Sequence, residues 1–276
     1  MNKRAWGMIV LLVLMGAGTV GVKNWVSKDP KETGAPKVRV IAHRGGAAHA
    51  PENTVAALER AIEFGAPWAE LDLRMTRDGV VVVLHDEDLL RTAGLEKAVC
   101  QMDFEQLRRV DVGGWFSSDY AGELVPTLEE VLELAKGKIS LLLELKHTTQ
   151  PQMMLQRVME QIRGKDMEEM CLLGSAELEL LAQSKELAPE VKTIYIGQMW
   201  RNDLQEFSYL DGYSICLSEL TREDVVQAHL SEREIYTWTV NELWEMERAM
   251  LLGADGLVTD NPKLAQEFLD RRLREP

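Results

Sequence analysis

The chain has 276 residues, of which 46% are hydrophobic and 28% are charged, a balance that excludes an intrinsically disordered protein. Its formal charge is -14 and is unevenly spread, because residues 1–36 carry five basic and two acidic side chains while residues 37–276 carry 26 and 43. A body this acidic repels nucleic acid and anionic membrane surfaces. An anionic substrate would therefore need a local positive site, such as a divalent cation supported by Arg or Lys.

The first predicted element is an apolar segment, residues 5–22, which contains no charged side chain and follows Lys3 and Arg4. This pattern is typical of a membrane-directed leader. We favour an uncleaved hydrophobic helix that anchors the chain, with the folded body outside the cytoplasm; a cleaved signal that leaves a secreted protein is the alternative. Residues 1–36 thus form an anchor or signal segment with its linker, and residues 37–276 form one folded domain.

Short apolar runs alternate with amphipathic helical stretches in the rest of the chain, which indicates repeated βα units around a parallel sheet. Eight such units favour a (β/α)8 TIM barrel over an open doubly wound sheet. The predicted strands are 38–43, 68–73, 139–145, 170–175, 192–197, 213–218, 234–240 and 255–259. Predicted helices include 54–64, with Asn53 as its N-cap, 127–135, 177–187 and 241–252.

A ninth apolar run, residues 80–84, follows the second strand too closely for a parallel crossover and is predicted to turn back against it. With Arg77 and Asp78 as a two-residue hairpin loop, the register sets His85 opposite Glu70. Residues 87–125 then form a small insertion after the second barrel strand. Because this insertion is expected above the mouth of the barrel, we predict that it shapes a substrate pocket.

Acidic side chains are expected at the C-terminal ends of two neighbouring strands. Glu70 and Asp72 are two residues apart, so both face the same side of a strand, into the barrel. Such a pair would repel without a cation or a shared proton, and oxygen ligands favour Mg²⁺ or Ca²⁺ over zinc. Glu144 could complete a three-carboxylate metal site, with Lys146 beside it for a phosphate oxygen. The structural alternatives are a solvent-facing strand edge for the first pair and a simple Glu–Lys salt bridge for the second.

Two histidines map to the same rim of the predicted barrel. His43 closes the first strand, and the glycines that follow it allow the backbone to approach an anion closely. The guanidinium group of Arg44 can donate two hydrogen bonds to one phosphate group. His43 and His85 together suit an acid–base pair. Glu52, at the start of the first helix, could bond to Arg44 or to a substrate.

The remaining residues near the predicted mouth carry weaker signals. Trp238 ends the seventh strand, where its indole could cover the apolar side of a ligand or fill the core. His49 and His147 lie close to the mouth without an identifiable partner. His229 falls on a helix, where a structural role is expected.

Together these segments resemble the glycerophosphodiester phosphodiesterase family. No single motif is diagnostic, but the ordered set is highly specific. The matching stretches are Ile41-Ala-His-Arg-Gly45, Pro51-Glu-Asn-Thr54, Glu70-Leu-Asp72 with Thr76-Arg-Asp-Gly79, Leu84-His-Asp86, Val125-Pro-Thr-Leu-Glu-Glu130, Glu144-Leu-Lys146, Trp238-Thr-Val-Asn241 and Gly253-Ala-Asp-Gly-Leu-Val-Thr-Asp-Asn-Pro262. Ser175 is followed by Ala176 where the family commonly has phenylalanine, so the head-group preference stays open.

The resemblance implies a barrel enzyme that hydrolyses glycerophosphodiesters to sn-glycerol 3-phosphate and an alcohol. It implies a divalent metal held by Glu70, Asp72 and Glu144. It also implies acid–base roles for His43 and His85, phosphate-stabilising roles for Arg44 and Lys146, and a place in the catalytic pocket for Glu52.

Three other functions agree with parts of this pattern. A hydrolase of the same fold could act on lysophospholipids, in the manner of a phospholipase D, or on phosphoinositides, and a membrane anchor makes a lipid substrate conceivable. A catalytically silent barrel used as a binding module should have lost one of the three acids or two histidines, all of which are present. A metal-dependent sugar isomerase would not need Arg44 beside His43.

Overall fold

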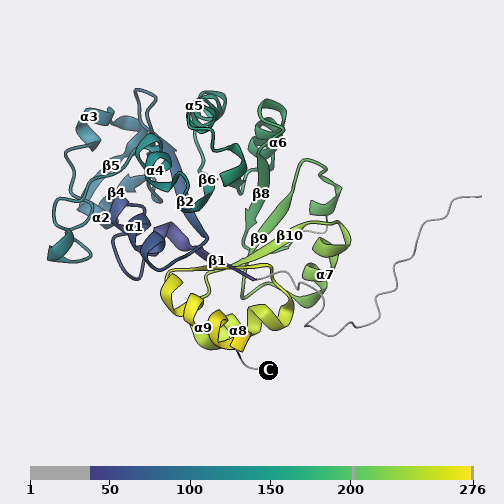
Figure 1. Ribbon diagram of the computed structural model, residues 1–276. Coiled ribbons are helices and arrows are strands. Elements are labelled where there is room, and N and C mark those ends of the chain that lie inside the picture. Colours follow the sequence, from purple (N-terminus) through teal and green to yellow (C-terminus); the bar gives the residue numbers. More distant parts are fainter. Residues whose placement is uncertain (1–37, 201–202, 275–276) are drawn as a thin grey trace, which may run out of the picture. The chain divides into compact units, whose positions relative to one another are not determined.

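The structure, a computed structural model, describes residues 38–200 and 203–274 (Figure 1). The predicted N-terminal hydrophobic helix, residues 5–22, and its linker lie outside these residues. Within the described ranges, no helix combines the length and the apolar composition that a membrane span requires.

Eight parallel strands close into a barrel, as predicted. The closure is complete because β1 pairs with β2 on one side and with β11 on the other. Each predicted strand is confirmed to within two residues at either end. In order around the barrel, the strands are β1 (Arg39–Ala42), β2 (Trp68–Met75), β6 (Ser140–Leu145), β7 (Cys171–Ser175), β8 (Lys192–Gly197), β9 (Gly212–Cys216), β10 (Glu234–Trp238) and β11 (Gly256–Thr259).

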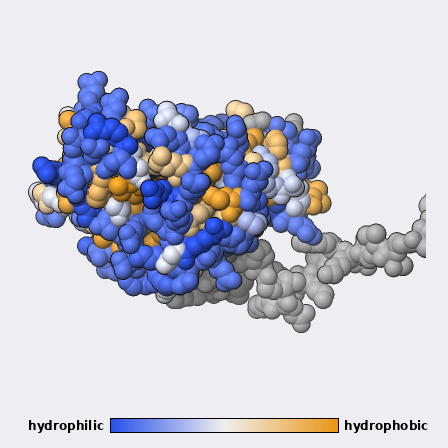
Figure 2. All heavy atoms as spheres, turned by 90° about the horizontal axis from the view of Figure 1, so that it is seen from above, coloured by the Kyte–Doolittle hydropathy of each residue, from blue (hydrophilic) through white to orange (hydrophobic). Residues whose placement is uncertain are grey.

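Helices surround this barrel and bury their apolar faces against the outer side chains of the strands (Figure 1). The side of the barrel that is uppermost in Figure 1 is mainly hydrophilic, with apolar side chains scattered over it (Figure 2). The four predicted helices named above are confirmed, each to within two residues. The helices are α1 (Val55–Glu63), α4 (Leu128–Ala135), α5 (Pro151–Gly164), α6 (Leu178–Leu187), α7 (Arg222–Leu230), α8 (Leu243–Leu252) and α9 (Pro262–Arg274).

The interior of the barrel is a packed core. A cluster of buried side chains fills it, to which six of the strands contribute. This core closes the barrel beneath the C-terminal ends of the strands, the face at which parallel barrels carry their active sites. The cluster consists of Ile41, Leu142, Leu172, Ile194, Ile196, Tyr236 and Val258.

The start of α1 differs from the prediction. Thr54, not Asn53, is the N-cap, because Thr54 Oγ1 accepts the N–H of Ala57 at 3.1 Å. Asn53 instead adopts a left-handed conformation, with φ of 59°, and directs its amide group to Asp72. The carboxylate of Asp72 is buried and needs hydrogen-bond donors, which Asn53 supplies. The helix does not need Asn53, because Thr54 caps it instead.

The hairpin after β2 forms as predicted, but its loop is one residue longer. β3 (Val81–Val83) pairs antiparallel with β2, Leu73 faces Val83, and residues 77–79 form a three-residue loop in which Gly79 has φ of 84°. A glycine in this conformation is typical of three-residue hairpin loops. The predicted pairing of His85 with Glu70 is therefore wrong by one residue. A shift of one residue in register exchanges the side chains on the two faces of a strand.

The insertion, residues 87–125, shares a small apolar core with β3. That core contains Leu89, Val99 and Leu107, all buried. The short elements of the insertion are β4 (Asp88–Leu89), α2 (Leu90–Ala93), β5 (Leu95–Ala98) and α3 (Phe104–Leu107).

Gly45 shapes the turn that carries the chain from β1 to α1. It has φ of 82°, and a Cβ atom there would lie 3.0 Å from both Ala57 Cβ and Leu58 N. Gly45→Ala should lower the free energy of unfolding by about 2–4 kcal/mol, because left-handed strain adds to overpacking. Gly137→Ala is the matched control: φ is 71° but nothing lies within 4 Å, so a loss of about 1–2 kcal/mol is expected. Equal losses in urea unfolding would contradict close packing at Gly45.

Candidate active site

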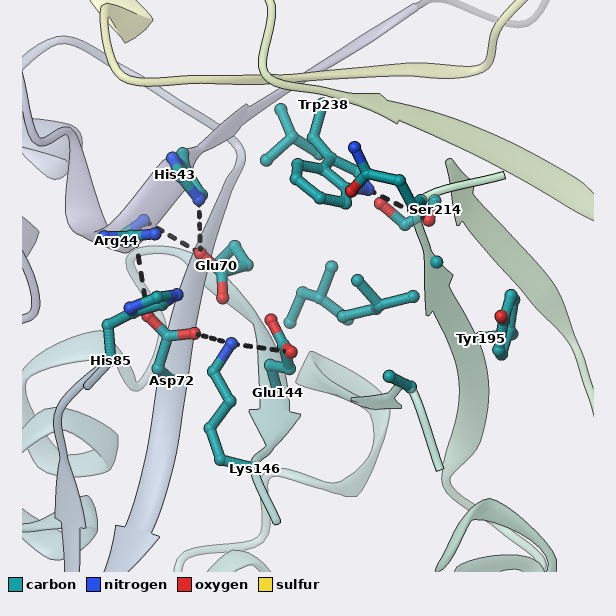
Figure 3. Close-up of a pocket in the computed structure, with 16 residues that line it drawn as sticks. His43, Arg44, Glu70, Asp72, His85, Glu144, Lys146, Tyr195, Ser214 and Trp238 are labelled. Carbon is teal, nitrogen blue, oxygen red and sulfur yellow. Dashed lines mark hydrogen bonds and ion pairs between the residues drawn. The ribbon is translucent and has the colours of Figure 1, made fainter. Parts of the chain in front are cut away.

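Three carboxylates meet at the mouth of the barrel (Figure 3). Glu70 and Asp72 project from β2, and Glu144 comes from β6, where the parallel register sets it beside Asp72. One oxygen atom from each lies within 4.8 Å of the other two. Glu70 is 3% exposed and Asp72 is 1% exposed, which excludes the solvent-facing strand edge.

Lys146 supplies positive charge to this cluster. Its Nζ lies 2.8 Å from Asp72 Oδ1 and 2.7 Å from Glu144 Oε1. Lys146 therefore forms the salt bridge with Glu144 that the sequence offered as an alternative, and it forms a second one with Asp72. Asn53 donates from Nδ2 to Asp72 Oδ2 at 2.7 Å and accepts the backbone N–H of Asp72. Burial alone would raise the pKa of Asp72, but Lys146 and the neighbouring positive groups hold it well below its usual range.

Glu70 lacks the close ammonium partner that Asp72 and Glu144 share. Its Oε2 accepts the backbone N–H of Arg44 at 3.0 Å and lies 3.9 Å from His43 Nε2. Its Oε1 is buried and has no hydrogen-bond partner among the described residues. Burial and the charge of Asp72 raise the pKa of Glu70 to about 8. A buried oxygen without a partner, beside two further carboxylates, fits a divalent cation that prefers oxygen ligands.

His43 is held by an acid that follows the last barrel strand. Its Nδ1 lies 2.6 Å from Asp260 Oδ1, and Asn241 donates from Nδ2 to Asp260 Oδ2 at 2.7 Å. The carboxylate favours the tautomer with a proton on Nδ1, which leaves Nε2 facing Glu70. Burial alone would lower the pKa of His43, but Asp260 and Glu70 raise it above its usual value. The sequence predicts no role for Asp260 or Asn241, although both stand just beyond the C-terminal ends of barrel strands.

His85 comes to the same pocket from the residues that follow β3. Its Nδ1 lies 2.7 Å from Asp86 Oδ1. Its backbone carbonyl accepts two hydrogen bonds from the Arg74 guanidinium, at 2.9 and 2.7 Å. Burial lowers the pKa of His85 below its usual value.

Arg44 lies between the acids and the start of α1. Its backbone is left-handed, with φ of 50°, and Nη1 donates to Glu52 Oε1 at 2.8 Å, as predicted. Its Nε is buried and has no hydrogen-bond partner in the described part of the chain. Glu52 also accepts two hydrogen bonds from Arg91, a residue of the insertion for which the sequence predicts no role. Nε of Arg44 also lies 3.7 Å from Asp72 Oδ2, and the positive charge of the guanidinium suits an anionic ligand.

One pocket of about 300 Å³ is bordered by both histidines, all three acids, Arg44 and Lys146. Its opposite wall is neutral, and Trp238 forms part of it while donating from Nε1 to the Ser214 carbonyl at 3.2 Å (Figure 3). Glu52 lies behind Arg44 and does not line the pocket. The neutral wall consists of Leu142, Ala176, Tyr195, Ile196, Gly197, Gln198, Ser214, Trp238 and Val258.

Some predictions about the surroundings of the site need correction. None of the pocket-lining residues comes from 87–125, so the prediction that the insertion shapes the pocket wall is wrong. The insertion packs on the apolar core that it shares with β3 and reaches the site's supporting residues through Arg91. The other histidines bond to residues outside the pocket lining: His49 to Asn261, His147 to Glu177 and His229 to Asp255.

The model of the glycerophosphoryl diester phosphodiesterase family matches residues 43–264, a range that includes every site residue described above. The chain belongs to this family. The predicted family and enzyme class, a glycerophosphodiester phosphodiesterase, are thereby confirmed.

Individual relatives support this assignment. A glycerophosphodiester phosphodiesterase of Caldanaerobacter subterraneus subsp. tengcongensis is 34% identical over 236 residues, which cover 82% of this chain and 96% of the relative. Lysophospholipase D GDPD3 of Mus musculus is 27% identical over 280 residues, 86% of this chain and 84% of the relative. The solved structure of an Oleispira antarctica phosphodiesterase in complex with the product sn-glycerol-3-phosphate is 27% identical, with a TM-score of 0.81 over 84% of this chain and 96% of that one.

Asp260→Asn should lower kcat for phosphodiester hydrolysis by about a hundredfold or more, because an amide neither fixes the Nδ1–H tautomer of His43 nor stabilises the protonated ring. Steady-state kinetics measure the loss. Asp255→Asn is the matched control, since it removes the acid of a second histidine pair that lies away from the pocket. A kcat for Asp260→Asn equal to that of the control would contradict the assignment.

Proposed function

We propose that this chain hydrolyses glycerophosphodiesters to sn-glycerol 3-phosphate and an alcohol during glycerophospholipid degradation. The observation that carries the proposal is the convergence of three carboxylates, two histidines, Arg44 and Lys146 on one pocket of about 300 Å³. The relative that was solved with this product gives independent support.

We infer that Glu70, Asp72 and Glu144 hold a divalent cation, Mg²⁺ or Ca²⁺. When Glu70 is also ionised, as binding of a cation requires, the three acids outnumber Arg44 and Lys146 by one negative charge, which would repel a phosphodiester anion. A divalent cation reverses that sign, and the carboxylate oxygens match the ligand preference of both ions. When bound, the ion polarises the phosphoryl group and offsets charge on its oxygens.

The positive side chains are proposed to hold the phosphate. Arg44 offers its guanidinium, whose Nη1 Glu52 holds at 2.8 Å and whose Nε lies 3.7 Å from Asp72 Oδ2 without a hydrogen bond. Lys146 offers its ammonium group at the edge of the acidic cluster. Donors fixed in this way need little rearrangement when charge develops on the phosphoryl oxygens.

The two histidines are proposed to transfer the protons. In each, Nδ1 is engaged by a carboxylate, Asp260 for His43 and Asp86 for His85, so Nε2 is the nitrogen available to a substrate. One histidine takes a proton from the attacking oxygen, and the other gives a proton to the leaving alcohol.

Trp238 is proposed to cover the apolar side of the substrate. It stands on the wall opposite the charged residues, and the pocket lining there contains no charged side chain among the described residues. A neutral wall suits a glycerol moiety better than it suits a second charged group.

A second candidate activity is cleavage of lysophospholipids. The similarity to a protein named lysophospholipase D favours it, as does the apolar character of the wall that Leu142, Ile196 and Val258 form with Trp238. In such a substrate an acyl chain is esterified to one of the two glycerol hydroxyl groups.

We also propose that the apolar segment 5–22 directs the folded domain to a membrane and out of the cytoplasm. Support comes from its uncharged composition and from the basic residues that precede it. Carbonate extraction of membranes from cells that make the full chain would retain an anchored protein and release one whose segment has been cleaved.

A substrate panel tests the proposed activity. We expect glycerol 3-phosphate from glycerophosphocholine and glycerophosphoethanolamine, with kcat/KM at least about tenfold higher than for lysophosphatidylcholine. Chelation should abolish turnover, and His43→Ala should lower it by about 10²–10⁴-fold. Cleavage of lysophosphatidylcholine alone would favour the second candidate. Full activity in chelator or in the variant would overturn the mechanism.

Metal binding should release a proton at neutral pH. Because the pKa of Glu70 is raised to about 8, this carboxyl group is mainly protonated at pH 7 and must ionise to bind a cation. Affinity for Mg²⁺ or Ca²⁺ should therefore rise by about tenfold per pH unit as pH approaches 8 and then level off. Calorimetric titration in buffers of different ionisation enthalpy measures the proton. Glu70→Gln should bind more weakly and release fewer protons, and proton release that did not fall in Glu70→Gln would contradict the assignment.

A further inference from the structure

Arg91, on α2 of the insertion, uses three of its nitrogen atoms to hold two different carboxylates. Its Nη1 and Nη2 donate to Glu52 Oε2 and Oε1 at 2.8 and 2.6 Å. Its Nε donates to Asp86 Oδ2 at 2.7 Å. The guanidinium therefore acts as a bridge between the start of α1 and the residue after His85.

Each carboxylate is also bonded to a residue of the pocket. Glu52 Oε1 also accepts Nη1 of Arg44 at 2.8 Å, and Asp86 Oδ1 lies 2.7 Å from Nδ1 of His85. We propose that Arg91 is a positioning residue that fixes a phosphate-binding side chain and a proton-transferring side chain at once. The inference rests on the proposed hydrolysis, in which Arg44 and His85 have those roles.

Charge balance explains why Arg44 needs this support. Glu52 is a buried acid, with 10% of its side chain exposed, and without Arg91 it would be paired with Arg44 alone. A buried carboxylate with one cationic partner holds that partner strongly. With a second cation on Glu52, that acid neutralises less of the positive charge of Arg44, and more of this charge remains for an anionic substrate.

Geometry explains why His85 needs it. The histidine lies beyond the end of β3, where no strand pairing fixes its ring. Asp86 is the acid on Nδ1, and Arg91 anchors the second oxygen of that acid. A displacement of about 1 Å in a reacting group can cost about a hundredfold in rate, so such an anchor has measurable value.

Arg91 is itself well anchored, although 42% of its side chain is exposed. Leu89 and Thr92, on either side of it in the chain, are buried at 0% and 5% exposure. Its guanidinium carbon also lies 5.8 Å from the ring centre of Trp115. The apolar core around the insertion thus holds Arg91 in place, and Arg91 orients Glu52 and Asp86. The insertion therefore supports the site although it does not line the pocket.

Arg91→Ala and Arg91→Lys test the proposal. We expect each to lower kcat/KM by about tenfold to a hundredfold, because a single ammonium group cannot reproduce the fork on two carboxylates. Arg77→Ala is the matched control: Arg77 forms a similar bidentate pair with Asp103, and neither residue lines the pocket. Its kcat/KM should stay within about twofold of wild type. Thermal unfolding of all three variants shows whether a loss of activity comes from unfolding or from displaced side chains. If Arg91→Ala does not fold, Arg91→Lys still tests the proposal.

A mutant cycle decides whether Arg91 acts through its two acids. In the Glu52→Gln/Asp86→Asn background, adding Arg91→Ala should cost less than about twofold, whereas independent effects would multiply. The Nδ1–H resonance of His85 in proton NMR should shift or broaden in Arg91→Ala and stay unchanged in Arg77→Ala. Wild-type kcat/KM in both Arg91 variants, multiplying losses in the cycle, or an unchanged resonance would overturn the inference. An inactive wild-type enzyme would instead overturn the proposed function, and the resonance would still test the bridge.

Discussion

The site depends on one electrostatic constraint, the placement of three carboxylates within 4.8 Å of one another where water is largely excluded. Like charges repel strongly at such distances when the local dielectric constant is low. The parallel register of β2 and β6 nevertheless fixes the acids side by side, so the surrounding chain must supply positive charge and donors. Lys146 and Asn53 supply them to Asp72, Lys146 also bonds to Glu144, and burial and the neighbouring charges still raise the pKa values of Glu70 and Glu144. The same imbalance makes a divalent cation the natural complement of the cluster.

A second layer of acids orients the groups that face the pocket. Asp260 holds His43, Asp86 holds His85, and Glu52 holds Arg44. Asp260 follows the last strand, Asp86 follows the hairpin strand and Glu52 precedes the first helix. The barrel therefore brings together segments that are far apart in sequence. Each acid engages one side of its partner, and we propose that the other side of that partner meets the substrate.

The sequence was sufficient for the barrel and for the residues that border the charged side of the pocket, because both follow from local patterns. Apolar runs of strand length mark the eight barrel strands and β3, and acids two residues apart on one strand must share a face. Contacts between distant segments left no such signal. Asn53 satisfied an N-cap pattern, yet it serves Asp72; Asp260 and Arg91 have partners 217 and 39 residues away. The hairpin register also depended on the left-handed conformation of Gly79, which a two-residue loop does not require.

Anomalous diffraction from crystals grown with Mn²⁺, an ion with similar oxygen-ligand preferences to Mg²⁺, tests the carboxylate cluster most directly. We expect one strong peak bordered by Glu70, Asp72 and Glu144 in the wild-type protein, and its loss in Glu70→Gln. A wild-type cluster without a peak, or a peak at another place in the barrel mouth, would contradict the central claim that these three acids form a cation site.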